Sequence, residues 1–122
     1  MRLIHSFTYA WQGIKYCFVS GGNFRIQLLI ASIVFFAGII FSLSATEWFT
    51  ILFCTSLVLG FEMMNTAIEK LSDMITTSIH PGIKIIKDVA AGAVLIVSVI
   101  SFVIACIIFL PKMYSLLNNL IK

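Results

Sequence analysis

Three stretches of the chain are almost free of charged residues. Uncharged sequence covers Ile26–Thr46 and Val89–Pro111, and a shorter run covers Trp48–Phe61. About 18 or more consecutive apolar residues are typical of a helix that crosses a bilayer. The first and last runs meet that length, and the middle run meets it only if the helix continues past Glu62. The pattern therefore predicts membrane spans at about 24–43, 47–71 and 88–110.

The first twenty residues follow a different pattern. Apolar residues recur there at alternating steps of three and four, which places them on one stripe of a helix: Leu3, Ile4, Phe7, Trp11, Ile14 and Phe18. The segment is too polar to span a bilayer, so we expect an amphipathic helix over about 3–19 that lies in the membrane surface. Gly21-Gly22-Asn23 is expected to break this helix, and Pro111 to end the last one.

Composition agrees with a membrane protein. Hydrophobic residues make up 61% of the 122 residues and charged residues 11%, whereas a soluble domain averages roughly 45–50% and about 25%. Three spans leave no room for a separate soluble domain, so we expect a single all-α domain over 1–122. The sequence has no run of basic residues of the kind that indicates nucleic-acid binding. The three cysteines, at positions 17, 54 and 106, are too scattered to indicate a disulfide framework or a zinc site.

The basic residues predict the orientation in the membrane. Six of them flank the start of the first span or lie between the second and third spans, and they are Arg2, Lys15, Arg25, Lys70, Lys84 and Lys87. The other end of the spans has only Lys112 and Lys122. Because basic residues concentrate on the cytoplasmic side, we expect the N-terminus and the loop between the last two spans to be cytoplasmic.

A polar stripe runs along the second predicted span. Asn65, Glu69 and Asp73 follow Glu62 by three, seven and eleven residues. At about 100° per residue, these four side chains fall within a sector of roughly 80° on one helix face. Because a carboxylate inside a bilayer costs at least ~2.5–3.5 kcal/mol, such a residue usually marks a functional site. The alternative is that Glu62 pairs with a Lys or an Asn and fixes helix packing.

Depth along the stripe divides the chemistry that we expect of it. Glu62 lies deepest and could accept a proton from a hydroxyl group at the interface. Glu69 lies about 10 Å nearer the water, where its carboxylate suits Mg²⁺ bound to a phosphate. Lys87 and Asp88, at the start of the third span, could add a phosphate contact and a second acidic group. This set is typical of phosphoryl transfer, although the chain has no glycine-rich phosphate loop.

Several motifs match one protein family. The segments Glu62-Met-Met-Asn-Thr-Ala-Ile-Glu69 and Lys87-Asp-Val-Ala-Ala-Gly-Ala-Val94 resemble the small bacterial membrane diacylglycerol kinases and undecaprenol kinases. Tyr9-Ala-Trp-Gln-Gly13, Asn23-Phe-Arg25 and His80-Pro81 are similar to the same family, so the resemblance covers nearly the whole chain. It implies an ATP- and Mg²⁺-dependent transfer of the γ-phosphoryl group to the hydroxyl of a membrane lipid alcohol.

The resemblance also implies roles for individual residues. Glu62 would be the general base, Asn65 a supporting polar group and Glu69 a metal ligand. Nucleotide contacts are implied for Arg2, Tyr9, His80, Lys87 and Asp88. Family members are trimers with active sites between protomers, so we expect a homotrimer in the bacterial cytoplasmic membrane, with its active sites on the cytoplasmic side.

One position departs from the family pattern. Relatives usually carry a metal-binding Glu three residues before the Phe of the Asn-Phe-Arg segment, and here that residue is Gly21. We expect a rebuilt metal site in which Asp73, Asp88 or water substitutes. The alternative is a catalytically weak or inactive relative that binds nucleotide or lipid. A proton pathway through the stripe is disfavoured because the other spans carry few polar residues. Undecaprenol and diacylglycerol are both candidate acceptors, and the motifs are more similar to the undecaprenol kinase branch.

Overall fold

The computed structural model describes every residue from Met1 to Lys122, and the fold consists of four helices. Their bounds are Arg2–Ser20 for α1, Gly22–Ile40 for α2, Ala45–Ile75 for α3 and Pro81–Ile121 for α4. Helices α2, α3 and α4 are each long and apolar enough to cross a membrane. The prediction of an all-α protein with three helices able to span a membrane is therefore confirmed.

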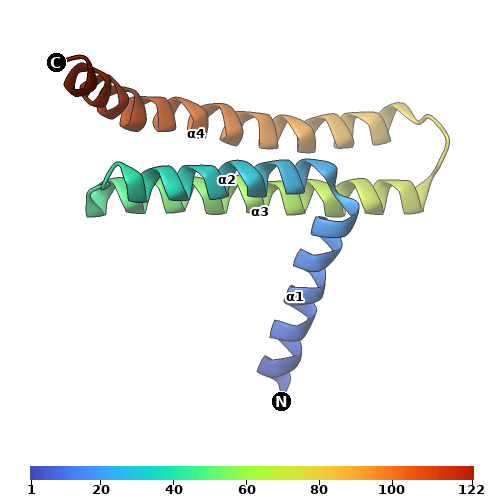
Figure 1. The fold of residues 1–122 in the computed structure, drawn as a ribbon. Helices are drawn as coiled ribbons and strands as arrows, with labels where there is room; N and C mark the ends of the chain where they lie inside the picture. The colour runs from blue at the N-terminus through green and yellow to red at the C-terminus, as the bar shows by residue number, and fades with distance from the viewer.

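Helix α3 is the central element of the fold. Figure 1 shows α2, α3 and α4 side by side with alternating directions, while α1 leaves them at a steep angle. Both α2 and α4 pack against α3, but no Cα atom of α2 lies within 8 Å of one in α4. The three spans therefore form an open arrangement in which α2 and α4 are separated over the surface of α3.

Helix α1 contacts the rest of the chain mainly at its C-terminal end. Cys17 in α1 and Phe24 in α2 are both buried at this junction. The apolar stripe of α1 is exposed along its length, including Phe7 and Trp11. An exposed apolar stripe on a helix outside the bundle agrees with the expected position in a membrane surface, which stays a prediction.

The turn between α2 and α3 is closed by a capping box. The Glu47 N–H donates to Ser44 Oγ at 3.2 Å, and the Ser44 N–H donates to Glu47 Oε1 at 3.0 Å. This reciprocal pair satisfies two backbone donors that the start of a helix leaves free. Lys112 of α4 lies 3.2 Å from the same Glu47 oxygen, so the ion pair also joins α3 to α4 at this end of the bundle.

Helix α4 is longer than the sequence predicts at both ends. Pro111 lies inside it and the helix continues to Ile121, so the prediction that Pro111 ends this helix is wrong. A proline removes one helical hydrogen bond, but the helix can retain the others by continuing, and proline is tolerated in this way in membrane helices. At the other end α4 begins at Pro81, because His80 caps it and proline is favoured at the first helical position.

Candidate active site

The polar stripe of α3 lies against its neighbours at one end and reaches the surface at the other. Glu62 is only 4% exposed and Asn65 is 8% exposed. Glu69 and Asp73, further along the same face, are exposed. Glu62 and Asn65 are therefore held among the helices. Glu69 and Asp73 are accessible to a soluble ligand, although Asp73 is paired with Lys87.

Glu62 faces a cavity rather than a packed interface. The cavity has a volume of about 300 Å³ and lies between α2, α3 and α4. Besides Glu62, its walls are formed by Asn23, Ile26 and Gln27 of α2 and by Ala91, Val94, Leu95 and Ser98 of α4. Small-molecule sites range from about 300 to 1,000 Å³, so the space beside the carboxylate suits a small reacting group. No ion pair joins Glu62 to a basic residue, so a packing role through such a pair finds no support.

Asn65 and Glu69 present oxygen atoms to the same region of α3. Asn65 Nδ2 donates to Glu69 Oε1 at 3.4 Å, which turns the amide oxygen Oδ1 away from that contact. This Oδ1 atom is buried and has no hydrogen-bond partner. An unpaired buried acceptor is costly unless a ligand satisfies it. Glu69 thus offers an exposed carboxylate and Asn65 a buried carbonyl oxygen without a partner. Both are ligand types that Mg²⁺ prefers.

The protein alone does not build a complete cage for a cation. No group of three or more Asp, Glu, His or Cys side chains could hold a metal. Mg²⁺ usually keeps several waters and is bound through one or two carboxylates together with substrate phosphates. The residues present therefore fit a magnesium ion that arrives with a nucleotide, and they do not form a permanent metal centre.

Two ion pairs organise the end of α4 nearest the loop. Lys87 Nζ donates to Asp73 Oδ1 at 2.6 Å, which joins α4 to α3. Lys84 Nζ donates to Asp88 Oδ2, also at 2.6 Å, within α4. The sequence indicated Lys87 and Asp88 as phosphate and acidic groups, but it did not indicate these partners. Lys87 is thereby held beside the outer end of the stripe.

The other residues expected at the nucleotide are His80, at the start of α4, and Arg2 and Tyr9, both in α1. The N–H groups of Gly82 and Ile83 donate to His80 Nδ1 at 3.1 and 3.4 Å, so His80 caps α4. Tyr9 stacks on His5 with their ring centroids 6.3 Å apart. Helix α1, which carries Tyr9 and Arg2, has no Cα atom within 8 Å of α4. A single chain therefore does not bring Arg2 or Tyr9 next to Lys87.

Comparison with known families assigns the chain to one of them. The model of the prokaryotic diacylglycerol kinase family matches residues 8–109. This chain belongs to that family. The matched region includes the whole polar stripe and every candidate site residue except Arg2, and the chain is accordingly a membrane lipid kinase.

Individual relatives of the family are similar over most of the chain. An undecaprenol kinase of Bacillus subtilis (strain 168) is 39% identical over 112 residues, which cover 92% of this chain and 91% of the relative. A diacylglycerol kinase of Synechocystis sp. is 35% identical over 117 residues, covering 95% of this chain and 67% of the relative. A diacylglycerol kinase of Helicobacter pylori is 28% identical over 95 residues, covering 78% and 74%.

Gly21, the residue that departs from the family pattern, occupies a tight position. It lies between α1 and α2, and its N–H donates to Cys17 O at 2.8 Å. A Cβ atom at this position would lie 2.8 Å from the same oxygen and 3.5 Å from the Phe24 Cβ. The helix junction of this lipid kinase is thus built around the absence of a side chain at position 21.

Two polar residues of the site carry no motif in the sequence. Gln27 and Ser98 line the Glu62 cavity from α2 and α4. Ser98 Oγ is buried and makes no hydrogen bond. The available signal was their polarity inside otherwise uncharged spans, where a polar group usually lines a cavity or a functional site. Their convergence on Glu62 depends on how the helices pack.

Proposed function

We propose that this protein uses ATP and Mg²⁺ to phosphorylate a membrane lipid alcohol, with Glu62 as the general base. The observation that carries the proposal is a buried carboxylate that borders a cavity in a lipid kinase. A carboxylate is costly to bury, and a position beside the acceptor hydroxyl gives it a chemical use.

In the proposed reaction, the hydroxyl oxygen of the lipid attacks the γ-phosphorus of ATP. The new bond joins this oxygen to phosphorus, the bond from phosphorus to the β–γ bridging oxygen breaks, and ADP leaves. Glu62 accepts the hydroxyl proton as the bond forms. Phosphoryl transfer depends mainly on positioning and charge stabilisation, so the chain's task is to align a lipid hydroxyl and a nucleotide at the ends of one helix face.

The outer part of the stripe would hold the nucleotide. Glu69 and Asn65 supply the oxygen atoms suited to Mg²⁺, and Lys87 supplies a cation for phosphate beside them. When bound, the metal would neutralise charge on the phosphate oxygens. Arg2 and Tyr9 lie away from this region in one chain, so their nucleotide contacts would have to come from a neighbouring protomer.

We propose that α3 forms the centre of a homotrimer. The face opposite the polar stripe, here named the back face of α3, consists of exposed residues at helical spacing: Phe53, Ser56, Gly60, Met64, Ala67 and Leu71. Ser56 and Gly60, four residues apart, are small enough to let helices approach closely. A Cβ atom at Gly60 would meet nothing within 4 Å, so this face has no partner inside the chain.

The same proposal places the loop between α3 and α4 in the cytoplasm of a bacterial inner membrane. This end of the bundle carries Lys70, Lys84 and Lys87, whereas the opposite end carries only Lys112 and Lys122. The charge asymmetry follows the positive-inside rule. The active site would then face the compartment that contains ATP.

The experiment is a phosphate-transfer assay on the purified protein in micelles. With Mg-ATP labelled on the γ-phosphate, the wild-type chain should label a lipid alcohol, and chelation of Mg²⁺ should stop the reaction. Glu62→Gln should lower kcat by about 10²- to 10⁴-fold, the range that a general base contributes. The matched control is Glu47→Gln, on the same helix but at the opposite end, which should leave kcat nearly unchanged.

Assembly is measured on the same samples. Size-exclusion chromatography with light scattering should give one oligomeric state for the wild type and for both variants. If the Glu62→Gln variant assembles normally and retains the wild-type kcat, Glu62 is not the general base. A wild-type protein that labels no lipid alcohol would remove the proposed activity.

A further inference from the structure

The last turns of α4 extend past the other two helices that can span a membrane. At this end of the bundle, Lys112 Nζ lies 3.2 Å from Glu47 Oε1 at the start of α3. The ring centroid of Phe109 lies 6.0 Å from that of Phe41, which follows α2. Beyond this level every residue of α4 is exposed, and we call residues 112–121 the tail of α4. The match to the family model ends at residue 109, so the tail lies outside the matched region.

The tail separates its apolar and polar residues onto two faces. At about 100° per residue, the apolar face covers a sector of about 100° and consists of Met113, Leu116, Leu117 and Leu120. The polar face has a similar width on the other side and consists of Ser115, Asn118 and Asn119. The four apolar residues are between 46% and 74% exposed. An apolar face that nothing in the chain covers marks a surface for a partner or a membrane.

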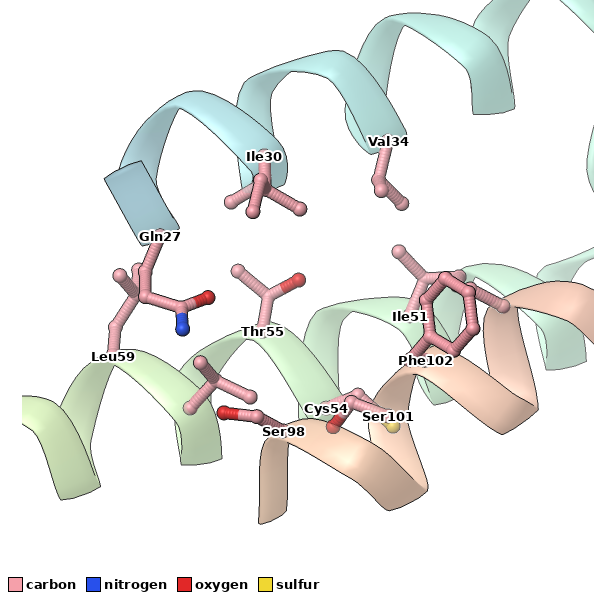
Figure 2. A pocket seen from close by; sticks show the side chains of 13 residues that line it. Gln27, Ile30, Val34, Ile51, Cys54, Thr55, Leu59, Ser98, Ser101 and Phe102 are labelled. Carbon is pink, nitrogen blue, oxygen red and sulfur yellow. The ribbon is translucent and has the colours of Figure 1, made fainter. Parts of the chain in front are cut away.

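The polar face of the tail lies on the side of α4 that faces the bundle. Figure 2 shows Ser101 of α4 among the side chains that line a cavity between α2, α3 and α4. Asn119 follows Ser101 by eighteen residues, which is about five helical turns, so both lie on the same side of the helix. The contacts agree, because Ser115 and Asn119 border a hollow together with Phe41. The apolar face therefore points away from the bundle.

This apolar face continues the outer side of the spanning part of α4. Leu117 follows Val99 by eighteen residues, so these two side chains project in the same direction. Val99 is 51% exposed within the apolar run, and in a bilayer it contacts lipid chains. The uncharged run from Val89 to Pro111 is about 35 Å long at ~1.5 Å per residue, which already matches a hydrocarbon thickness of ~30 Å. A straight continuation would therefore hold the apolar face of the tail in water.

Pro111 bends α4 in the direction of the apolar face. A proline ring clashes with the carbonyl group four residues earlier, so the helix opens on the proline side and bends toward the opposite side. Leu120 follows Pro111 by nine residues and therefore lies about 180° from it around the helix. Figure 1 shows the end of α4 curving away from α2 and α3. A helix that leaves a bilayer and tips toward its outer side brings that side down onto the membrane.

We propose that the tail of α4 is an interfacial helix that binds the lipid surface at the end of the bundle opposite the proposed nucleotide site. Its apolar face enters the boundary between headgroups and acyl chains, about 5–10 Å deep, and its polar face meets water. The other candidate occupant is a second copy of the chain. The trimer proposed above forms through the back face of α3, which α4 does not cover, so the tails lie at its periphery. This inference does not depend on the kinase reaction.

The test places a tryptophan on each face of the tail. Leu117→Trp alters the apolar face, and Asn118→Trp, the matched control, alters the polar face. Each purified variant is reconstituted in phosphatidylcholine vesicles, and the fluorescence of the wild type, which contains Trp11 and Trp48, is subtracted. The tryptophan added by Leu117→Trp should emit at shorter wavelength and lose most of its intensity in vesicles of brominated phosphatidylcholine. The tryptophan added by Asn118→Trp should instead be quenched by acrylamide in the water.

Leu120→Trp repeats the measurement further along the apolar face and should give the same result as Leu117→Trp, so the test does not rest on one variant. All three variants keep the residues of the proposed active site, and size-exclusion chromatography should give the wild-type oligomer for each. Equal quenching by acrylamide on both faces would overturn the inference, because the tail then stands in water. Apolar-face tryptophans that neither acrylamide nor brominated lipid quenches would also overturn it, because protein then covers them.

Discussion

A side chain at position 21 should loosen the junction between α1 and α2. A Cβ atom there would lie 2.8 Å from the Cys17 carbonyl oxygen, which is a backbone atom and cannot rotate away. The surrounding residues are tightly held, since Cys17 is 5% exposed and Phe24 3%. Inserting atoms into such a site typically costs about 1–3 kcal/mol, and we expect Gly21→Ala to lower stability by that amount.

Gly22 provides the matched control for this prediction. It is the first residue of α2, and a Cβ atom on it would meet nothing within 4 Å. Gly22→Ala should therefore be neutral or stabilise the protein by up to ~1 kcal/mol, because alanine restricts the unfolded chain. The assay is thermal unfolding followed by circular dichroism in micelles, with both variants and the wild type at the same protein and detergent concentrations.

The same variants test why this chain has Gly21 where relatives usually carry a metal-binding Glu. If position 21 is limited by space, Gly21→Glu should lose as much stability as Gly21→Ala. It should not lower the Mg²⁺ concentration that phosphate transfer requires. Gly22→Glu should fold like the wild type. A Gly21→Ala variant that unfolds at the wild-type temperature would refute the steric argument. So would a stable Gly21→Glu variant that needs less Mg²⁺.

Two further predictions concern side-chain contacts seen in the structure. Asp73→Asn should change the unfolding midpoint little, because an exposed ion pair contributes about 0–1 kcal/mol. It should raise the KM for ATP, because Lys87 loses the 2.6 Å contact that positions it. An unchanged KM would deny Asp73 a role in positioning Lys87. Ser44→Ala should remove the capping box and cost about 0.5–2 kcal/mol in thermal unfolding. Ser44→Thr should retain most of that stability, and equal losses in both variants would argue against the cap.

The number of candidate spans and the common face of the polar stripe follow from the sequence. Charge-free length is sufficient to place three membrane helices, and a period of 3.6 residues is sufficient to place Glu62 and Asn65 on one face. The bounds of α4 were harder to predict from the sequence. Local signals around Pro111 favour a helix end, but a membrane-spanning helix gains by keeping its remaining backbone hydrogen bonds.

The contacts between helices could not be derived in the same way. The pairing of Lys87 with Asp73 joins residues 14 positions apart across a loop, and it depends on the register of α4 against α3. The meeting of Gln27 and Ser98 at the Glu62 cavity also depends on the space between α2 and α4. Sequence periodicity gives the face of each helix, but the distance and register between faces come from packing.

The two faces of α3 suggest why its neighbours leave a gap. The polar stripe turns Glu62 toward α2 and α4, and the back face with Ser56 and Gly60 is left for neighbouring protomers under the proposed trimer. Because α2 and α4 pack on α3 and not on each other, association through the back face would not require the cavity between them to close. A bundle in which α2 and α4 also packed on each other would bury more apolar surface, but it would separate Glu62 from the bilayer. For a lipid kinase whose acceptor is dissolved in the membrane, the open arrangement supplies a lateral path to Glu62, the proposed base.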